Sequence, residues 1–261
     1  GYMNEHHAHS DDFADRPLPY RVYLNKAFND DGMQVSYVLP TDFFAEIGGG
    51  AFRADDFPAG GSVQGLGAWS AFARIGGDIA DNQSWRIGGY YLNSDAADRK
   101  SNEDTVTFIG ESRLFAADFR YTMAPTGNPR QSELALQAEV FQRSEDGTYQ
   151  DANAGTGRIT FDDATRGWYA QGVYKFAPRW RIGARYSRMD TAAAPAGLVG
   201  SALDPGDHDP QTISVMGDWT NSEFGRIRLQ YNHEELSSGA DDDQFILQYV
   251  MSIGAHGAHA F

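Results

Sequence analysis

The sequence predicts an all-β protein, an antiparallel transmembrane β-barrel with about 11 visible strands and about 12 or more in the closed barrel. Three observations lead to this prediction. Apolar and polar residues alternate with a period of two along most of the chain. Short turns alternate with long polar loops, and one face of the alternating runs is apolar while the other is charged.

The alternation defines each strand. In 131–143, Leu136 and Val140 share one face, and Glu139 and Arg143 share the other, because successive side chains of a strand point to opposite sides. No convincing amphipathic helix interrupts the series. The predicted strands span about 33–39, 42–53, 66–78, 84–95, 112–123, 131–143, 166–176, 180–188, 211–219, 224–232 and 244–253.

The connections alternate in length. Short ones lie at 40–41, 81–83, 125–129, 178–179 and 221–222. Long ones, rich in Asp, Gly, Ser and Ala, lie at about 54–64, 96–110, 145–165, 190–210 and 235–243. In outer-membrane barrels the short turns are periplasmic and the long loops are extracellular, so we expect the same layout here.

The composition of the two faces indicates which one meets lipid. The apolar face is dotted with Gly and Ala and has aromatic residues near its ends: Trp69, Trp85, Tyr91, Tyr121, Trp168, Tyr174, Trp180 and Trp219. Such residues favour the two membrane interfaces. An Arg or Lys facing lipid at the midplane costs roughly 2–4 kcal/mol, so the charged face is expected to line a wet lumen. We predict that the lumen field and selectivity are set by Arg120, Arg185, Arg228, Asp118, Glu139 and Asp218.

A soluble antiparallel sandwich or barrel is the alternative, with the apolar face forming its core. The regular alternation of loop lengths disfavours it, since Greek-key sandwiches rarely show that regularity. The many Gly and Ala residues also disfavour it, because they fill a core poorly but cost nothing against lipid.

Composition excludes several function classes. The chain has no cysteine, so disulfides, thiolate metal sites and cysteine nucleophiles are excluded. The net charge of −15 argues against nucleic acid as a partner. Mean hydropathy is −0.51 and no apolar run reaches the roughly 20 residues of a membrane helix. Gly48 to Gly50 and the Ser, His and Asp residues form no recognisable phosphate loop or triad, so no enzyme activity is predicted.

The ends of the chain lead to two expectations. From Phe245 every second residue continues the apolar face, and the terminal Phe261 is in phase with it. Outer-membrane barrels similarly end in Phe, which the barrel assembly machinery reads as a signal. About eleven strands is an odd number, whereas bacterial barrels close with an even one. We therefore expect an upward strand before residue 1.

A histidine cluster opens the chain in the stretch NEHHAHSDD. His7 and His9 point the same way in an extended segment, and His6 lies beside them. Imidazole binds zinc and copper, and a carboxylate such as Asp12, or neighbouring Asp11 and Asp15, completes such sites. His208 lies on the same outer side and is a further candidate ligand, whereas His256 and His259 are expected at the opposite rim. A polar loop with incidental histidines explains the pattern equally well.

Several motifs, NEHHAH, APTGNPR and GAHGAH above all, make the chain resemble Gram-negative outer-membrane proteins commonly labelled zinc-regulated or TonB-dependent receptors. The resemblance spans nearly the whole chain. Family members begin with further strands before the histidine motif, and this chain shows no TonB box. Asn4, Glu5, His7, His9 and Asp12 match the motif, and His6 is a local variation. The layout is also similar to phosphate-selective porins, which implies a histidine loop folded into the pore.

These observations predict residues 1–32 as a histidine-containing loop segment, folded into the pore, and 33–261 as the barrel wall. The predicted function is a porin-like channel of the cell outer membrane for uptake of a small solute, a divalent metal ion such as Zn²⁺. The alternative is a docking barrel whose long acidic loops anchor a partner protein. The expected partners are outer-membrane lipid, lipopolysaccharide, the assembly machinery and such a protein.

Overall fold

The computed structural model describes residues 1–5, 10–61, 65–222, 225–237 and 240–251. In this part of the chain eleven strands form one antiparallel sheet in sequence order, each hydrogen-bonded to the strands before and after it. The strands are β1 (Gly32–Val38), β2 (Phe44–Phe52), β3 (Ala68–Ala80), β4 (Gln83–Ser101), β5 (Val106–Met123), β6 (Glu133–Asp151), β7 (Ile159–Ala177), β8 (Trp180–Asp190), β9 (Gln211–Ser222), β10 (Gly225–Ser237) and β11 (Ala240–Met251). All eleven predicted strands are confirmed.

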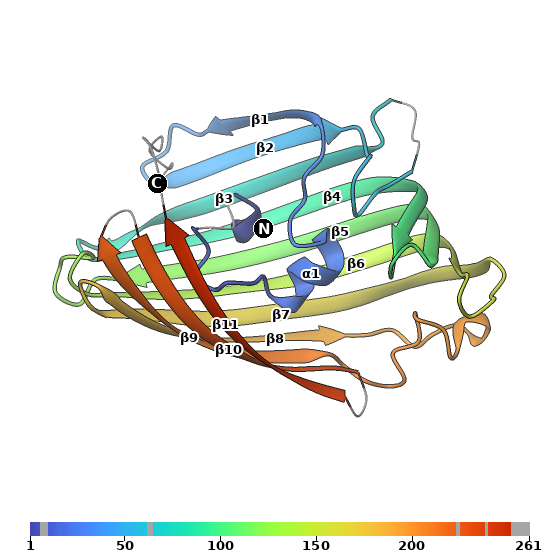
Figure 1. Ribbon diagram of the computed structural model, residues 1–261. Helices are drawn as coiled ribbons and strands as arrows, with labels where there is room; N and C mark the ends of the chain where they lie inside the picture. The colour runs from blue at the N-terminus through green and yellow to red at the C-terminus, as the bar shows by residue number, and fades with distance from the viewer. Residues whose placement is uncertain (6–9, 62–64, 223–224, 238–239, 252–261) are drawn as a thin grey trace.

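The sheet curves into a trough whose hollow holds the first part of the chain (Figure 1). Within the described residues β1 pairs only with β2 and β11 only with β10, so the sheet is not closed. Three short helical elements accompany it: η1 (Tyr2–Glu5), α1 (Leu18–Leu24) and η3 (Ala196–Leu198). None of the helices in the described residues is long and apolar enough to cross a membrane.

Consecutive strands are connected alternately at the two ends of the sheet. At the turn end, β3–β4 and β7–β8 are joined by residues 81–82 and 178–179. At the loop end, β2–β3 and β8–β9 are joined by 53–67 and 191–210. This layout follows the predicted alternation of connections.

The predicted loops at 96–110, 145–165 and 235–243 are wrong in extent. The first two belong mostly to β4–β7, which continue to turns at 102–105 and 152–158. In the third, β10 continues to Ser237 and β11 begins at Ala240, so the predicted alternation of lengths fails at these connections.

The polar composition of the first two obscures the alternation of inward and outward side chains. Val106, Phe108 and Tyr149 point inward and pack on Leu198 of the 191–210 loop. The packing of this small apolar cluster therefore offsets the free-energy cost of pairing these polar segments as strands.

The two faces of the wall are inverted relative to a soluble protein. Ile182 and Leu229 on the convex side are 53% and 60% exposed, whereas Glu139 and Arg228 on the concave side are each 1% exposed. Apolar residues thus face out and charged residues face in, as predicted. The soluble alternative requires the apolar face to form the core, and this face forms none.

Aromatic residues on the outward face form two rows. Four strands carry one residue of each row, six positions apart: Trp85 and Tyr91, Tyr121 and Phe115, Tyr174 and Trp168, and Trp180 and Tyr186. Six residues of strand span about 20 Å. Because strands of outer-membrane barrels tilt by about 35–45°, this length corresponds to about 15 Å of height, within the roughly 25 Å apolar band that aromatic girdles flank.

Candidate functional site: the segment inside the trough

The N-terminal segment, in its described residues 1–5 and 10–28, lies in the hollow of the sheet (Figure 1). Its helix α1 contacts β7 and β8. The helix ends at Asn25, whose left-handed conformation allows the backbone N–H of Lys26 to reach the carbonyl of Tyr20 at 2.9 Å. Gly167 of β7 gives the helix room, because a Cβ there would lie 3.1 Å from Cγ of Pro19 and 2.6 Å from Sδ of Met189.

An apolar cluster fixes the segment to the wall. Tyr20 and Tyr23 of α1 are fully buried, and the ring of Tyr20 packs edge-on against Phe141 with centroids 5.2 Å apart. Nearer the turn end, Phe13 packs on Val173 and Met216. Burying aromatic side chains of this size contributes about 2 kcal/mol each, so the segment is held by more than its charges.

Glu139 of β6 is the deepest polar anchor. Its carboxylate accepts hydrogen bonds from the backbone N–H of Tyr2, from the Tyr20 hydroxyl at 3.2 Å and from the Tyr169 hydroxyl at 2.8 Å. Gln137 in turn donates to the Tyr169 oxygen at 2.5 Å. The Glu139 carboxylate therefore connects the first residues of the segment and its helix to β6, and through Tyr169 to β7.

Glu5 forms the second anchor, at β3 and β4. Its carboxylate lies 2.7 Å from Nη2 of Arg86 and 3.0 Å from Nη2 of Arg74, and the Tyr90 hydroxyl donates to it at 3.0 Å. The Arg86 and Arg120 guanidiniums lie over the ring of Tyr2, at 4.8 and 4.9 Å from its centroid. The first turn of the chain is thus surrounded by wall cations.

Three aspartates form the third anchor, at β8–β10. Asp12 accepts from Arg181 at 2.8 Å, and Asp15 accepts from Arg185 at 2.7 Å. The backbone carbonyl of Asp11 accepts from Nη2 of Arg228 at 2.9 Å. The same Arg228 lies 3.2 Å from Asp218, which also binds Arg181. Segment and wall therefore share one network of opposite charges.

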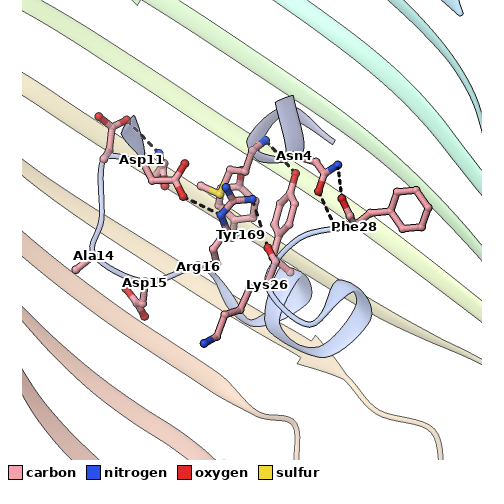
Figure 2. A network of polar contacts seen from close by, with 12 residues as sticks. Asn4, Asp11, Ala14, Asp15, Arg16, Lys26, Phe28 and Tyr169 are labelled. Atoms are coloured by element: carbon pink, nitrogen blue, oxygen red, sulfur yellow. Dashed lines mark hydrogen bonds and ion pairs between the residues drawn. The ribbon is translucent and has the colours of Figure 1, made fainter. Parts of the chain in front are cut away.

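The segment is also closed on itself, as Figure 2 shows. Arg16 pairs with the Asp11 carboxylate at 2.7 Å and reaches the carbonyl of Lys26 at 3.3 Å, while Asn4 exchanges two hydrogen bonds with the backbone of Phe28. Burial raises the pKa of the Asp11 carboxyl to about 6, against the opposing effect of the Arg16 guanidinium. Asn4, Asp11, Asp15 and Lys26 border a cavity of about 690 Å³ that extends to Gln244 of β11.

The six predicted lumen residues all lie on the concave side. Glu139, Arg185, Arg228 and Asp218 take part in the anchors described above, and Arg120 donates to Gln137 at 3.1 Å. Asp118 is 3% exposed and lies 3.9 Å from Arg86, and neither of its carboxylate oxygens has a hydrogen-bond partner.

The predicted metal ligands are not brought together in the described residues. His6, His7 and His9 lie outside them, as do His256, His259 and the predicted assembly signal Phe261. Asp12 is occupied by Arg181 and by Gln171, whose amide donates at 3.4 Å. His208 donates through Nε2 to the carbonyl of Glu235 at 3.0 Å.

The strand register separates the two remaining ligands. Asp12 pairs with Arg181 near the start of β8. Arg188, near the loop that carries His208, lies seven residues further along the same strand, and seven residues span about 23 Å. Among the described residues no group of three or more His, Asp or Glu side chains could hold a metal ion.

Sequence reasoning missed the partners of the segment. Arg74, Arg86 and Arg181 receive Glu5 and Asp12, yet they were not among the predicted site residues. Their signal was present, because each lies in phase with the charged face of its strand. Inward arginines are candidate partners for an acidic segment, and NEHHAHSDDFAD is the acidic stretch nearest the start of the chain.

Comparison with known proteins places the chain beside two kinds of relative. It matches no family model. A protein of Aquifex aeolicus (strain VF5), described as uncharacterized, is 25% identical over 287 residues. The match covers all of this chain, which spans 58% of that protein's length.

The chain also resembles two solved structures to a limited extent. The toluene transporter TodX of Pseudomonas putida superposes with a TM-score of 0.39 at 11% identity, over 82% of this chain and 72% of that one. The monoaromatic hydrocarbon channel CymD gives a TM-score of 0.38 at 11% identity, over 85% and 74% of the two chains.

Proposed function

We propose that this chain forms the wall of a channel for a small solute in the outer membrane of a Gram-negative bacterium. The N-terminal segment inside the trough is the plug of this channel. One observation supports this most directly. The concave side of an outwardly apolar sheet is lined with buried charges, and an acidic N-terminal segment occupies that side by pairing with them.

The membrane setting follows from the exposed side chains. Ile213, Leu247 and Val140 are 50%, 76% and 53% exposed on the convex face. Contiguous exposed apolar surface is rare on soluble monomers and marks contact with a partner or a membrane. Only closed barrels and helices satisfy all backbone hydrogen bonds in lipid, so β1 and β11 must find partner strands for the wall to work. Lipid and lipopolysaccharide are the partners we propose for this face, and the assembly machinery inserts it.

The segment is suited to act as a plug that can leave. Two of its three polar anchors are ion pairs and the third, Glu139, is a set of hydrogen bonds. Removing the segment exposes Arg181, Arg185 and Glu139 to a lumen that water can enter. Charges in water lose little when a partner departs, whereas the same loss in a dry core costs several kcal/mol. The apolar contacts of Tyr20 and Phe13 then set the energy of the closed state.

A divalent metal ion such as Zn²⁺ is the solute we propose, and two observations support it. The chain carries −15 net charge, which attracts cations. In the sequence, the histidine motif, His6 to His9, lies between two anchored residues. These are Glu5, which pairs with Arg86, and Asp12, which pairs with Arg181. A cation bound by those histidines would therefore act on both anchors. The resemblance to zinc-regulated outer-membrane receptors is in keeping with this solute.

Conductance in planar bilayers tests the channel. We expect small or intermittent currents from the protein and larger, steadier ones from the double variant Asp12→Asn, Asp15→Asn, which removes two charges that bind the plug. The control is Asp162→Asn, Asp163→Asn, the same change at the loop end of β7, which should leave the currents unaltered. A membrane-inserted protein that conducts in none of these forms contradicts the channel and favours the docking barrel.

A further inference from the structure

A second cavity, of about 390 Å³, lies at the loop end of the sheet. The 191–210 loop forms one side of it, β6 and β7 form another, and α1 of the plug forms its floor through Val22 and Tyr23. None of the anchors described above uses it. Its volume falls within the range of small-molecule sites, about 300–1,000 Å³.

The lining of this cavity is mostly apolar. The rings of Tyr149 and Phe161 pack edge-on with centroids 5.3 Å apart, and Met189, Leu198 and Leu203 complete the apolar wall. Leu198 is 1% exposed because it inserts between the strand extensions. Apolar surface with few polar groups is the usual composition of a pocket for an organic ligand.

The 191–210 loop is fastened to the strands, so the cavity is preformed. The backbone N–H of Ala202 donates to Asp151 of β6 at 2.8 Å, and Asp209 pairs with Arg188 of β8 at 2.8 Å. Nε2 of His208 reaches the Glu235 carbonyl of β10 at 3.0 Å. A loop held at separate points loses little conformational entropy on binding, which favours affinity.

The lining also carries charged and polar side chains: Arg143, Glu145, Thr165, Asp190, Thr191, Asp204, His208 and Ser237. The Arg143 guanidinium lies 4.8 Å from the centroid of Tyr23 and 3.4 Å from Glu145, and its side chain is 12% exposed. Glu145 also pairs with Arg99 at 2.6 Å and accepts from the Tyr149 hydroxyl at 2.6 Å. Glu145 therefore balances the charge of Arg143, whose exposed part can donate to a ligand oxygen.

The rim of the cavity disfavours anions. The pKa of Asp204 lies below its ordinary value because the backbone N–H groups of Gly200 and Gly206 donate to it. Asp204 is thus ionised at neutral pH on the lining of the cavity, and a negatively charged molecule is repelled there.

We propose that this cavity is a binding site for a small uncharged molecule with an aromatic or similarly compact apolar body and one hydrogen-bond acceptor. The body occupies the space between Tyr149, Phe161 and Leu203, and the acceptor oxygen faces Arg143. The occupant rests on Val22 and Tyr23, so it touches the plug directly. This site goes beyond the proposed passage of a metal ion, which uses the concave side nearer the turn end.

The test uses three naphthalene derivatives that share one ring system. The full chain in amphipol is titrated by calorimetry with 2-acetylnaphthalene, 2-naphthoate and 2-naphthylmethylammonium. We expect saturable binding of the neutral ketone and binding at least about tenfold weaker for both charged compounds. The ammonium group would face the Arg143 guanidinium, and the carboxylate group would meet the ionised Asp204. Equal affinity for all three, or preference for a charged one, overturns the proposal.

Two variants localise the site. Leu203→Trp fills the cavity and should abolish saturable binding of the ketone, whereas Leu66→Trp, the same change at a residue 69% exposed in another loop, should leave it intact. Arg143→Met keeps the volume and should weaken the ketone by about tenfold, the loss of one hydrogen bond to a charged donor. Ketone binding that survives Leu203→Trp contradicts the site. Conductance without any ligand tests the channel separately, so the two proposals can fail independently.

Discussion

Asp12 and Arg181 form an ion pair of 2.8 Å between the plug and the first residues of β8, 169 residues apart in sequence. Arg181 simultaneously holds Asp218 through two hydrogen bonds, at 3.0 and 2.7 Å. The pair therefore connects the plug to a charge network that the wall already contains, and the first prediction concerns this connection.

Asp12→Asn should loosen the plug without unfolding the wall. Because the chain has no cysteine, a single Ala14→Cys substitution reports on the segment. We expect maleimide to label that cysteine about fivefold faster or more when Asp12→Asn is added, since a half-buried ion pair contributes about 1 kcal/mol. The matched control adds Asp42→Asn at the β1–β2 turn, and its labelling rate should equal that of Ala14→Cys alone.

Glu139→Ala should lower the stability of the protein strongly. The change leaves the Tyr20 and Tyr169 hydroxyls and the Tyr2 backbone N–H without their acceptor inside the trough. Each unsatisfied buried donor costs about 1–3 kcal/mol, so we expect a loss of about 3 kcal/mol or more in urea unfolding from micelles. Glu133→Ala, at the turn end of the same strand, should cost less than about 1 kcal/mol. Equal midpoints would show that the anchor carries no stability.

Ala138→Arg tests which side of the wall meets hydrocarbon. Ala138 lies on the outward face of β6, between the two aromatic rows, and pairs with Ala170. In lipid the new charge should cost about 2–4 kcal/mol of folding free energy. Gln142→Arg, four residues further on the same face and exposed, should be almost neutral. Two neutral substitutions, measured by urea unfolding in lipid vesicles, would mean that water covers this face.

Zinc titration tests the histidine motif. The double variant His7→Ala, His9→Ala should bind Zn²⁺ at least about tenfold more weakly by calorimetry, because imidazole nitrogens are preferred zinc ligands. Circular dichroism should be unchanged, since the described strands begin at Gly32. His233→Ala is the control, because its ring pairs with Asp243 at 2.8 Å at the loop end. An unaltered titration in the double variant refutes the metal role of the motif.

The strands were predictable because lipid and water impose the period of two on every strand of such a wall. Leu136 and Glu139 already indicated which face would be exposed and which buried. The ends of β4–β7 were not predictable in the same way. Residues such as Asp98 and Asp146 made their segments resemble loops, and only the packing of Phe108 on Leu198 shows why they pair.

The candidate site was predictable in part. The inward phase of Arg185 and Arg228 identified them as lumen residues from the sequence. Their partners in the plug could not be identified, because contacts between Asp15 and Arg185 join positions 170 residues apart and depend on how the segment folds back. Asp12 was interpreted as a metal ligand because a carboxylate can bind either a metal ion or a guanidinium. The amino-acid sequence does not show that the guanidinium of Arg181 lies close to it.

The six-position interval between aromatic rows has a consequence for where the protein can reside. The interval recurs on β4, β5, β7 and β8, so the distance between the rows is the same on these four strands. A thicker bilayer would bury the rings below the headgroups, and the lipid would have to compress at a modest cost for each ångström of mismatch. The bacterial outer membrane is thinner than average, so the short interval suits it better than it suits a thicker bilayer.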